Sequence, residues 1–140
     1  MKRPIFGVLS VLATAMFVAL PTVQAQSRLM ANVPFDFQVG NKAMAAGSYE
    51  VLSISEQVDL VNNMGTGASA FVVEAIHIKA MHDEGAKLVF NKYGNQYFLS
   101  QIWDGRSNVG IQLPKSKREK ELVLAAKRTY DSETITVAMK

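Results

Sequence analysis

The chain carries few side chains that could do chemistry, and they form no recognisable catalytic or metal-binding motif. His77 and His82 are the only imidazoles, and there is no cysteine. The two histidines lie five positions apart, with Glu74, Asp83 and Glu84 nearby. Two histidines and one carboxylate can hold zinc, but this spacing is equally typical of solvated polar residues at a strand end. The sequence therefore predicts no metal, no cofactor and no catalytic residue.

The glycine-containing segment 62–69, NNMGTGAS, could cradle a phosphate only if it joined a strand to a helix. The residues on both sides of it favour strands, so we expect a hairpin loop. The Gly-x-Ser-x-Gly, His-Glu-x-x-His and phosphate-loop patterns are also absent from the sequence. We therefore expect a protein that is not an enzyme; an enzyme using scattered acidic residues and the two histidines is the alternative.

One basic cluster stands near the start of an expected helix: Lys115, Lys117, Arg118 and Lys120. Glu119 and Glu121 are interleaved with it, which is typical of a solvated helix start. Positive charge at a helix N-terminus opposes the helix dipole by about 0.3–1 kcal/mol per charge. Contact with an anionic lipid or polysaccharide is therefore the alternative role of this cluster.

Residues 87–103, KLVFNKYGNQYFLSQIW, predict a β-hairpin that turns at Gly94 and Asn95. This turn fixes the expected cross-strand pairs, which are Lys92 with Tyr97, Phe90 with Leu99 and Leu88 with Gln101. Both faces of the hairpin are apolar. One face carries Leu88, Phe90, Tyr97, Leu99 and Trp103, and the other carries Val89, Tyr93, Phe98 and Ile102. If the second face is only partly covered, Tyr93, Phe98 and Ile102 are candidates for binding an apolar ligand.

The elements around this hairpin are mostly strands, because the apolar residues recur with a period of two. The expected strands span residues 33–39, 49–54, 58–61, 69–80 and 134–139. Pro34 cannot donate to a ladder, so the first of them belongs at a sheet edge. Ser116 and Glu119 have the spacing of a capping box at the start of a helix over about residues 116–128. The fold class is mainly β: a single antiparallel β-sandwich or small barrel of about seven strands, with that helix packed on it.

The first 25 residues have the pattern of a secretory signal peptide. Lys2 and Arg3 precede the uncharged run 5–20, and small residues end at Ala25. We expect cleavage after Ala25, which leaves a single β-rich domain over residues 26–140; a membrane anchor is the alternative. The protein would then be exported to the periplasm or the outside, with no transmembrane segment and, without cysteine, no disulfide. Removing Lys2 and Arg3 lowers the formal net charge by two, from +3 to +1, so we expect no nucleic-acid partner.

The motifs VPFDFQVG, AAGSY, LVFNKYGNQYFLSQIW and LPKSKREKEL together resemble a group of small, uncharacterised, secreted bacterial proteins. Their shared pattern is V-P-F-x-F-x-V-G, P-A-G-x-Y, L-V-F-x-x-Y-G-x-x-Y-F-L and L-P-x-S-x-x-E-x-E-L. Ala45 departs from it, since the pattern has proline there. The resemblance implies an exported β domain of unknown function and carries no functional residue over to this chain.

Two kinds of function remain open. The first is a non-catalytic interaction or structural module of the cell envelope that acts through a sheet edge or through the second hairpin face. Its partner would be an envelope protein or a second copy of the chain. The alternative is a small protein that binds an apolar, lipid-like molecule between sheet and helix.

Overall fold

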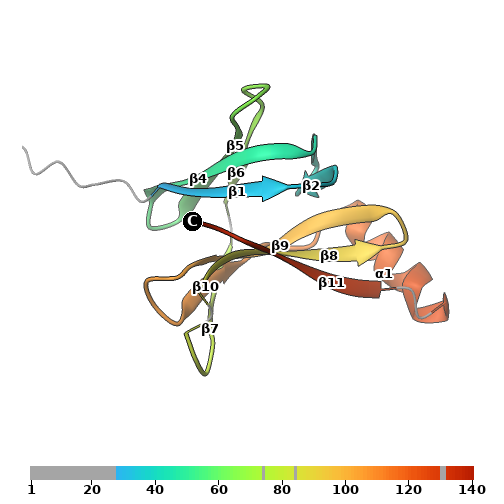
Figure 1. The fold of residues 1–140 in the computed structure, drawn as a ribbon. Helices are drawn as coiled ribbons and strands as arrows, with labels where there is room; N and C mark the ends of the chain where they lie inside the picture. Colours follow the sequence, from blue (N-terminus) through green and yellow to red (C-terminus); the bar gives the residue numbers. More distant parts are fainter. Residues whose placement is uncertain (1–27, 74, 84, 130–131) are drawn as a thin grey trace, which may run out of the picture.

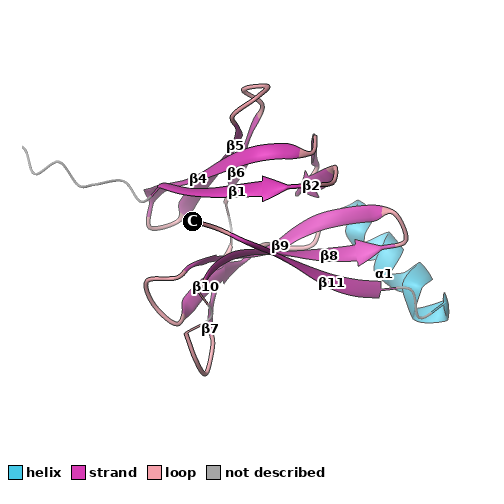
Figure 2. Ribbon diagram, viewed as in Figure 1, coloured by secondary structure: helices cyan, strands magenta, loops and turns pink. Residues whose placement is uncertain are grey.

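The computed structural model describes residues 28–140 apart from residues 74, 84 and 130–131, so the expected signal peptide lies outside the described residues. Two sheets pack face to face, and one helix lies on the outer side of the larger sheet (Figure 1). Figure 2 shows that strands make up both layers. The expected fold class is confirmed: the fold is mainly β and sandwich-like, and it is not a closed barrel.

The smaller sheet has the order β1-β4-β5-β6, formed by β1 (Arg28–Val33), β4 (Gly47–Ser55), β5 (Val58–Asn63) and β6 (Ser69–Val72). The main path of the larger sheet is β11-β8-β9-β10-β7, formed by β11 (Ser132–Ala138), β8 (Ala86–Tyr93), β9 (Gln96–Asp104), β10 (Val109–Gln112) and β7 (Ile76–Lys79). A short hairpin, β2 (Phe37–Val39) and β3 (Lys42–Met44), joins it through β9. The strands pair antiparallel except for the parallel pair of β2 and β9. The only helix in the described chain is α1 (Lys117–Thr129).

The described residues hold eleven strands, more than the sequence predicts. Part of the excess comes from the long strand expected over residues 69–80, which is two strands in different sheets. β6 pairs with β5 in the smaller sheet, whereas β7 pairs with β10 in the larger one. The chain therefore crosses from one layer to the other between Val72 and Ile76.

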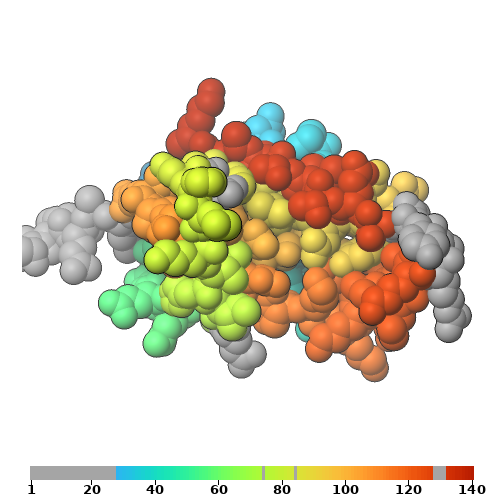
Figure 3. Space-filling model, turned by 90° about the horizontal axis from the view of Figure 1, so that it is seen from below, coloured from blue at the N-terminus to red at the C-terminus, as the bar shows by residue number. Residues whose placement is uncertain are grey.

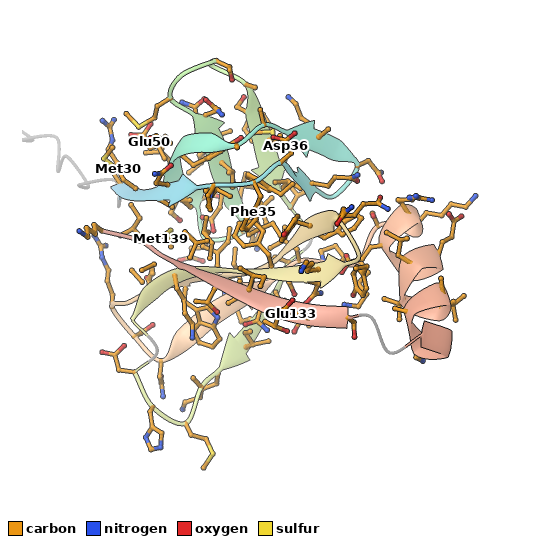
Figure 4. The ribbon with its side chains drawn as sticks, turned by 45° about the vertical axis from the view of Figure 1, so that its right-hand side comes forward. Met30, Phe35, Asp36, Glu50, Glu133 and Met139 are labelled. Carbon is orange, nitrogen blue, oxygen red and sulfur yellow. The ribbon has the colours of Figure 1, made fainter. Side chains whose placement is uncertain are left out.

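The core lies between the two sheets and is rich in aromatic rings. Phe35, which points into the interlayer space in Figure 4, stacks on Tyr97 with ring centroids 4.0 Å apart. It also meets Phe90 edge to face, with centroids 5.1 Å apart. Tyr49 and Phe90 are completely buried. Such rings bury a large apolar area each, which suits a domain without disulfides.

The central hairpin of β8 and β9 contains a β-bulge that the sequence does not reveal. The expected pairs Lys92 with Tyr97 and Phe90 with Leu99 are present, but Leu88 lies opposite Ile102 instead of Gln101. Ser100 is the extra residue, because Val89 pairs with Gln101 while the next pair is Phe90 with Leu99. An extra residue reverses which side chains face the core. The assignment of Ile102 to the second face and of Trp103 to the first is therefore wrong: Ile102 belongs to the main core.

The start of α1 agrees with its sequence signature. The backbone N–H of Glu119 donates to the Ser116 hydroxyl oxygen at 3.1 Å, as an N-cap requires. The helix begins at Lys117 and ends at Thr129, within one residue of the expected range. Over the part of the chain that the structure describes, no helix has the length and apolar character to cross a membrane.

One edge of the smaller sheet is closed by the C-terminal end of the chain. The backbone N–H of Met30 in β1 donates to the Lys140 carbonyl at 2.9 Å, and Lys140 N–H donates back to Met30 at the same distance. The C-terminus accordingly lies beside β1 in Figure 1, and Figure 4 shows Met139 next to the interlayer space. β1 is an edge strand of the smaller sheet, and its edge is occupied. The single strand expected over residues 33–39 is wrong: β1 ends at Val33 and β2 begins at Phe37, so Pro34 lies between two strands.

Candidate functional site

Two of the three expected ligand-binding residues, Tyr93 and Phe98, lie together beneath α1. Their ring centroids are 6.0 Å apart, and Ala126 packs against them in a second, smaller core. Phe98 is 2% exposed, so the helix covers this part of the hairpin's second face. Ile102 lies on the other side of the sheet, in the core between the layers. The structure thus brings Tyr93 and Phe98 together and separates Ile102 from them.

Glu119 is a buried carboxylate that fastens α1 to the sheet. It is 4% exposed, and its Oε1 accepts hydrogen bonds from Asn91 Nδ2 at 2.9 Å and from the Tyr93 hydroxyl at 3.3 Å. Lys115 Nζ lies 3.5 Å from the same oxygen. Burial and the neighbouring carboxylate raise the pKa of the Tyr93 hydroxyl to about 12. These contacts hold α1 over Tyr93, so packing of the helix accounts for the burial of this side chain without a ligand.

The four residues of the basic cluster have unequal roles. Lys115 forms the ion pair with Glu119, and Arg118 bonds to side chains on β9 and on its own helix. Lys117 and Lys120 are exposed, and no ion pair to either is found among the described side chains. Two of the four residues, Lys115 and Arg118, therefore have structural contacts. The expected contact with an anionic lipid or polysaccharide would depend on Lys117 and Lys120.

The histidines lie on separate features. His77 is in β7, while His82 is in the loop that follows it, and both are exposed. Glu74 and Glu84, which the sequence places near them, fall outside the described residues. Across the described part of the chain, no three His, Asp or Glu side chains are grouped so that they could hold a metal ion. The glycine segment is the hairpin loop between β5 and β6, where Asn63 Oδ1 accepts from the N–H groups of Gly65 and Thr66.

The strongest candidate site is a groove beside β6, which we call the β6 groove. Its volume is about 600 Å³, which lies within the range of about 300–1,000 Å³ that is typical of ligand pockets. Phe71 and Val73 form one wall and are 63% and 49% exposed. The β2–β3 turn forms the facing wall, and Leu113 and Pro114 complete the lining.

The main chain of β6 has hydrogen-bonding groups that face this groove. Ala68 accepts from Asn63 N–H on β5 at 2.7 Å, and antiparallel pairs alternate in their bonding, so Ala70 and Val72 also face β5. Ser69 and Phe71 therefore direct their N–H and C=O groups outward. Lys42 donates to the Ser69 carbonyl from the facing wall. No described group bonds to the main chain of Phe71.

This site is one that reasoning from sequence missed. The run SAFVV reads as part of one long strand, and its neighbours in space cannot be deduced from alternation alone. The only available signal is the lack of charge from Ser69 to Val73. Natural edge strands usually carry a lysine, a proline or another residue that blocks pairing. An uncharged strand such as β6 is therefore unusual at the edge of a sheet.

Comparison with known proteins leaves the geometry of the β6 groove as the basis for a functional assignment. No protein-family model, no curated protein and no solved structure matches this chain.

Proposed function

We propose that the protein is a non-catalytic interaction module that binds an extended segment of a partner protein along β6. The observation that carries this proposal is the outward-facing main chain of Phe71, in an uncharged edge strand beside a groove. A partner strand placed there would extend the smaller sheet by β-augmentation. Main-chain hydrogen bonds would supply affinity, and the exposed Phe71 side chain would supply apolar contact.

Among the sheet edges, β6 is the best suited to this role. The edge of β1 is occupied by Lys140. β7 carries the exposed, polar His77 and Lys79, and β11 carries Glu133 among exposed threonines. Charged and polar residues on an edge discourage pairing with another chain. β6 has none of these deterrents.

The chemistry of the groove favours a polypeptide occupant over a lipid. An acyl chain would leave the N–H and C=O groups of Phe71 desolvated without partners, which costs about 1–3 kcal/mol per group. A peptide strand would satisfy both. Lys42 is the only charged side chain among the described residues of the lining, so an acidic residue or a terminal carboxylate of the partner would complement it.

The groove also favours a single extended segment over a second copy of this chain. The β2–β3 turn stands across the groove from β6, so only a narrow strip of the edge is open. A second β6 would bring its own β2–β3 turn into the same space, whereas an isolated strand would not. We propose that the partner is an envelope protein, reached after export directed by residues 1–25.

Peptide selection followed by binding measurements would test the proposal. Peptides of about ten residues, the length that spans a short edge strand, would be selected from a displayed library on the purified chain. Phe71→Pro removes the outward N–H without touching the ladder to β5, and edge strands tolerate proline. We expect this change to weaken the best peptide by at least about tenfold.

Two further variants make the test specific. Phe71→Ala keeps the N–H and removes only the ring, so it should weaken binding less than Phe71→Pro. Leu124→Ala alters an exposed apolar residue on α1 and should have no effect. Selected peptides that bind Phe71→Pro as tightly as the unmodified protein would refute the proposal, and so would a selection that yields no peptide of micromolar affinity.

A further inference from the structure

A second cavity lies between the two sheets, at the end of β9 that is remote from α1. Its volume is 210 Å³. The interior is apolar, with Val51 from the smaller sheet and Ile102 from the larger one, both 4% exposed. Leu29 and Ile111 are partly buried members of the same core. The cavity is therefore an opening of the main core to solvent, which we call the interlayer cleft.

The mouth of the interlayer cleft is acidic. Asp59 from β5 and Asp104 from β9 approach it from opposite sheets, and the other polar residues of the lining are Ser53, Glu56, His77 and Ser107. No lysine or arginine of the described chain lines it. Among the described side chains, none forms a lysine or arginine ion pair with Asp59 or Asp104. The cleft thus combines an apolar interior with carboxylates at its mouth that have no lysine or arginine ion pair among the described side chains.

Asp59 is the most constrained of these acids. Burial raises the pKa of its carboxyl group above the ordinary value; a hydrogen bond with Ser53 opposes this, and the nearby Asp104 adds to it. The electrostatic interaction with His77 lowers that pKa slightly. A cation placed between Asp59 and Asp104 would offset both the cost of burying their negative charge and the repulsion between the two carboxylates.

The lining and the volume of the cleft indicate which kind of cation it could bind. The carboxylates and the imidazole are not grouped closely enough to coordinate a metal ion. An apolar interior adds nothing to metal binding but suits a hydrocarbon chain. A volume of 210 Å³ is below the range of about 300–1,000 Å³ that holds drug-sized ligands, so the ligand must be small.

We propose that the interlayer cleft binds a small organic cation with an apolar tail, such as an alkylammonium ion. The tail would lie against Val51 and Ile102, and the ammonium group would lie between Asp59 and Asp104. This site is separate from the β6 groove, so either proposal can fail without the other.

Three probes with the same hydrocarbon chain and different charge would test the inference: n-hexylammonium, 1-hexanol and hexanoate. Binding would be followed by NMR on the purified chain through the methyl signals of Val51 and Ile102. We expect n-hexylammonium to bind at least about tenfold more tightly than the neutral or the anionic probe. Equal affinities, or shifts that avoid both methyl groups, would overturn the proposal.

Matched variants would then localise the charge effect. Asp59→Asn and Asp104→Asn should each weaken n-hexylammonium by about tenfold and leave 1-hexanol unchanged. Glu121→Gln removes an exposed carboxylate on α1 and should change nothing. Val109→Phe alters an exposed residue at the cleft, so it should block all three probes without harming the fold. A loss of binding in Glu121→Gln equal to that in Asp59→Asn would show only general attraction to a negative surface.

Discussion

At the scale of single residues, Glu119 is the most deeply buried charged side chain among those described. A carboxylate that is 4% exposed is unfavourable without polar partners, and here Asn91, Tyr93 and Lys115 all contact its Oε1. The same residue supplies its backbone N–H to the Ser116 cap. Glu119 therefore determines both where α1 begins and where it sits on the sheet.

Replacing Glu119 with alanine should leave the Asn91 amide and the Tyr93 hydroxyl buried without an acceptor. We expect the free energy of unfolding to fall by about 1–3 kcal/mol. Urea denaturation would measure the loss. Glu119→Gln, which keeps an acceptor oxygen of similar shape, should lose less; equal losses in the two variants would contradict this role for the carboxylate.

The Tyr93 hydroxyl predicts a specific loss of stability in alkali. Its pKa is raised to about 12 in the folded protein from 10.0, mainly by burial and then by Glu119. Between these two values the unfolded chain has lost the proton that the folded chain still holds, so stability must fall as pH rises from 10 to about 12. Urea midpoints across this range would show the fall, and Tyr93→Phe should reduce it. An unchanged slope in Tyr93→Phe would show that other groups cause the effect.

Trp103 depends on the absence of a side chain at Gly110. A β-carbon on Gly110 would lie 2.5 Å from the nearest atom of the indole ring, which is too close. Gly110→Ala should therefore cost about 1–3 kcal/mol through overpacking. Chemical denaturation followed by the fluorescence of Trp103, the only tryptophan, would report it. Gly65→Ala has its closest neighbour at 3.4 Å and serves as a control; comparable losses in both would contradict the steric account.

At the scale of elements, the bulge at Ser100 decides which side of β9 faces the core. Upstream of it Leu99 is in the core, and downstream of it Ile102 is in the core, although the two are an odd number of residues apart. The outward side of the sheet then receives Trp103, whose Nε1 donates to Gln101 at 2.9 Å. One inserted residue thus gives β9 a continuous apolar contact with the core.

Deleting Ser100 should remove the bulge without changing which residues face the core. Leu99, Gln101 and Ile102 would then alternate regularly opposite Phe90, Val89 and Leu88, so Ile102 stays inward. The deletion does remove the Ser100 carbonyl that accepts from the Leu113 N–H at 2.8 Å, so we expect a loss of about 1–3 kcal/mol. Ser100→Ala keeps that carbonyl and should cost less. Thermal unfolding of both variants would measure the difference, and a deletion variant as stable as Ser100→Ala would contradict this role of the carbonyl.

At the scale of the whole molecule, the fold class and the position of α1 could be predicted because they depend on local patterns. The spacing of Ser116 and Glu119 is such a local signal, and it agrees with the structure. The alternation from Val33 to Val39 predicted which side chains are buried, but not the break between β1 and β2. The bulge at Ser100 and the crossing after Val72 could not be predicted, because pairing with distant strands decides them. Both candidate sites lie where such distant segments meet.

The two layers also leave the molecule with two unlike faces. Figure 3 shows the outer side of the larger sheet, with β7 at one end and α1 at the other. Glu133 lies on this side of the molecule, on β11 in Figure 4. Within the described residues, no helix covers the smaller sheet, and its one open edge is β6. If a partner strand binds as we propose, the smaller sheet offers it an open edge at β6.

The most direct test of this account is hydrogen exchange of individual amides, measured by NMR with and without a peptide selected on the β6 groove. We expect Phe71 N–H to exchange much faster than Ala70 and Val72 N–H in the free protein, because only the latter bond to β5. The peptide should then slow Phe71 specifically. A Phe71 amide that is already protected in the free protein, or that the peptide leaves unprotected, would contradict strand addition at β6.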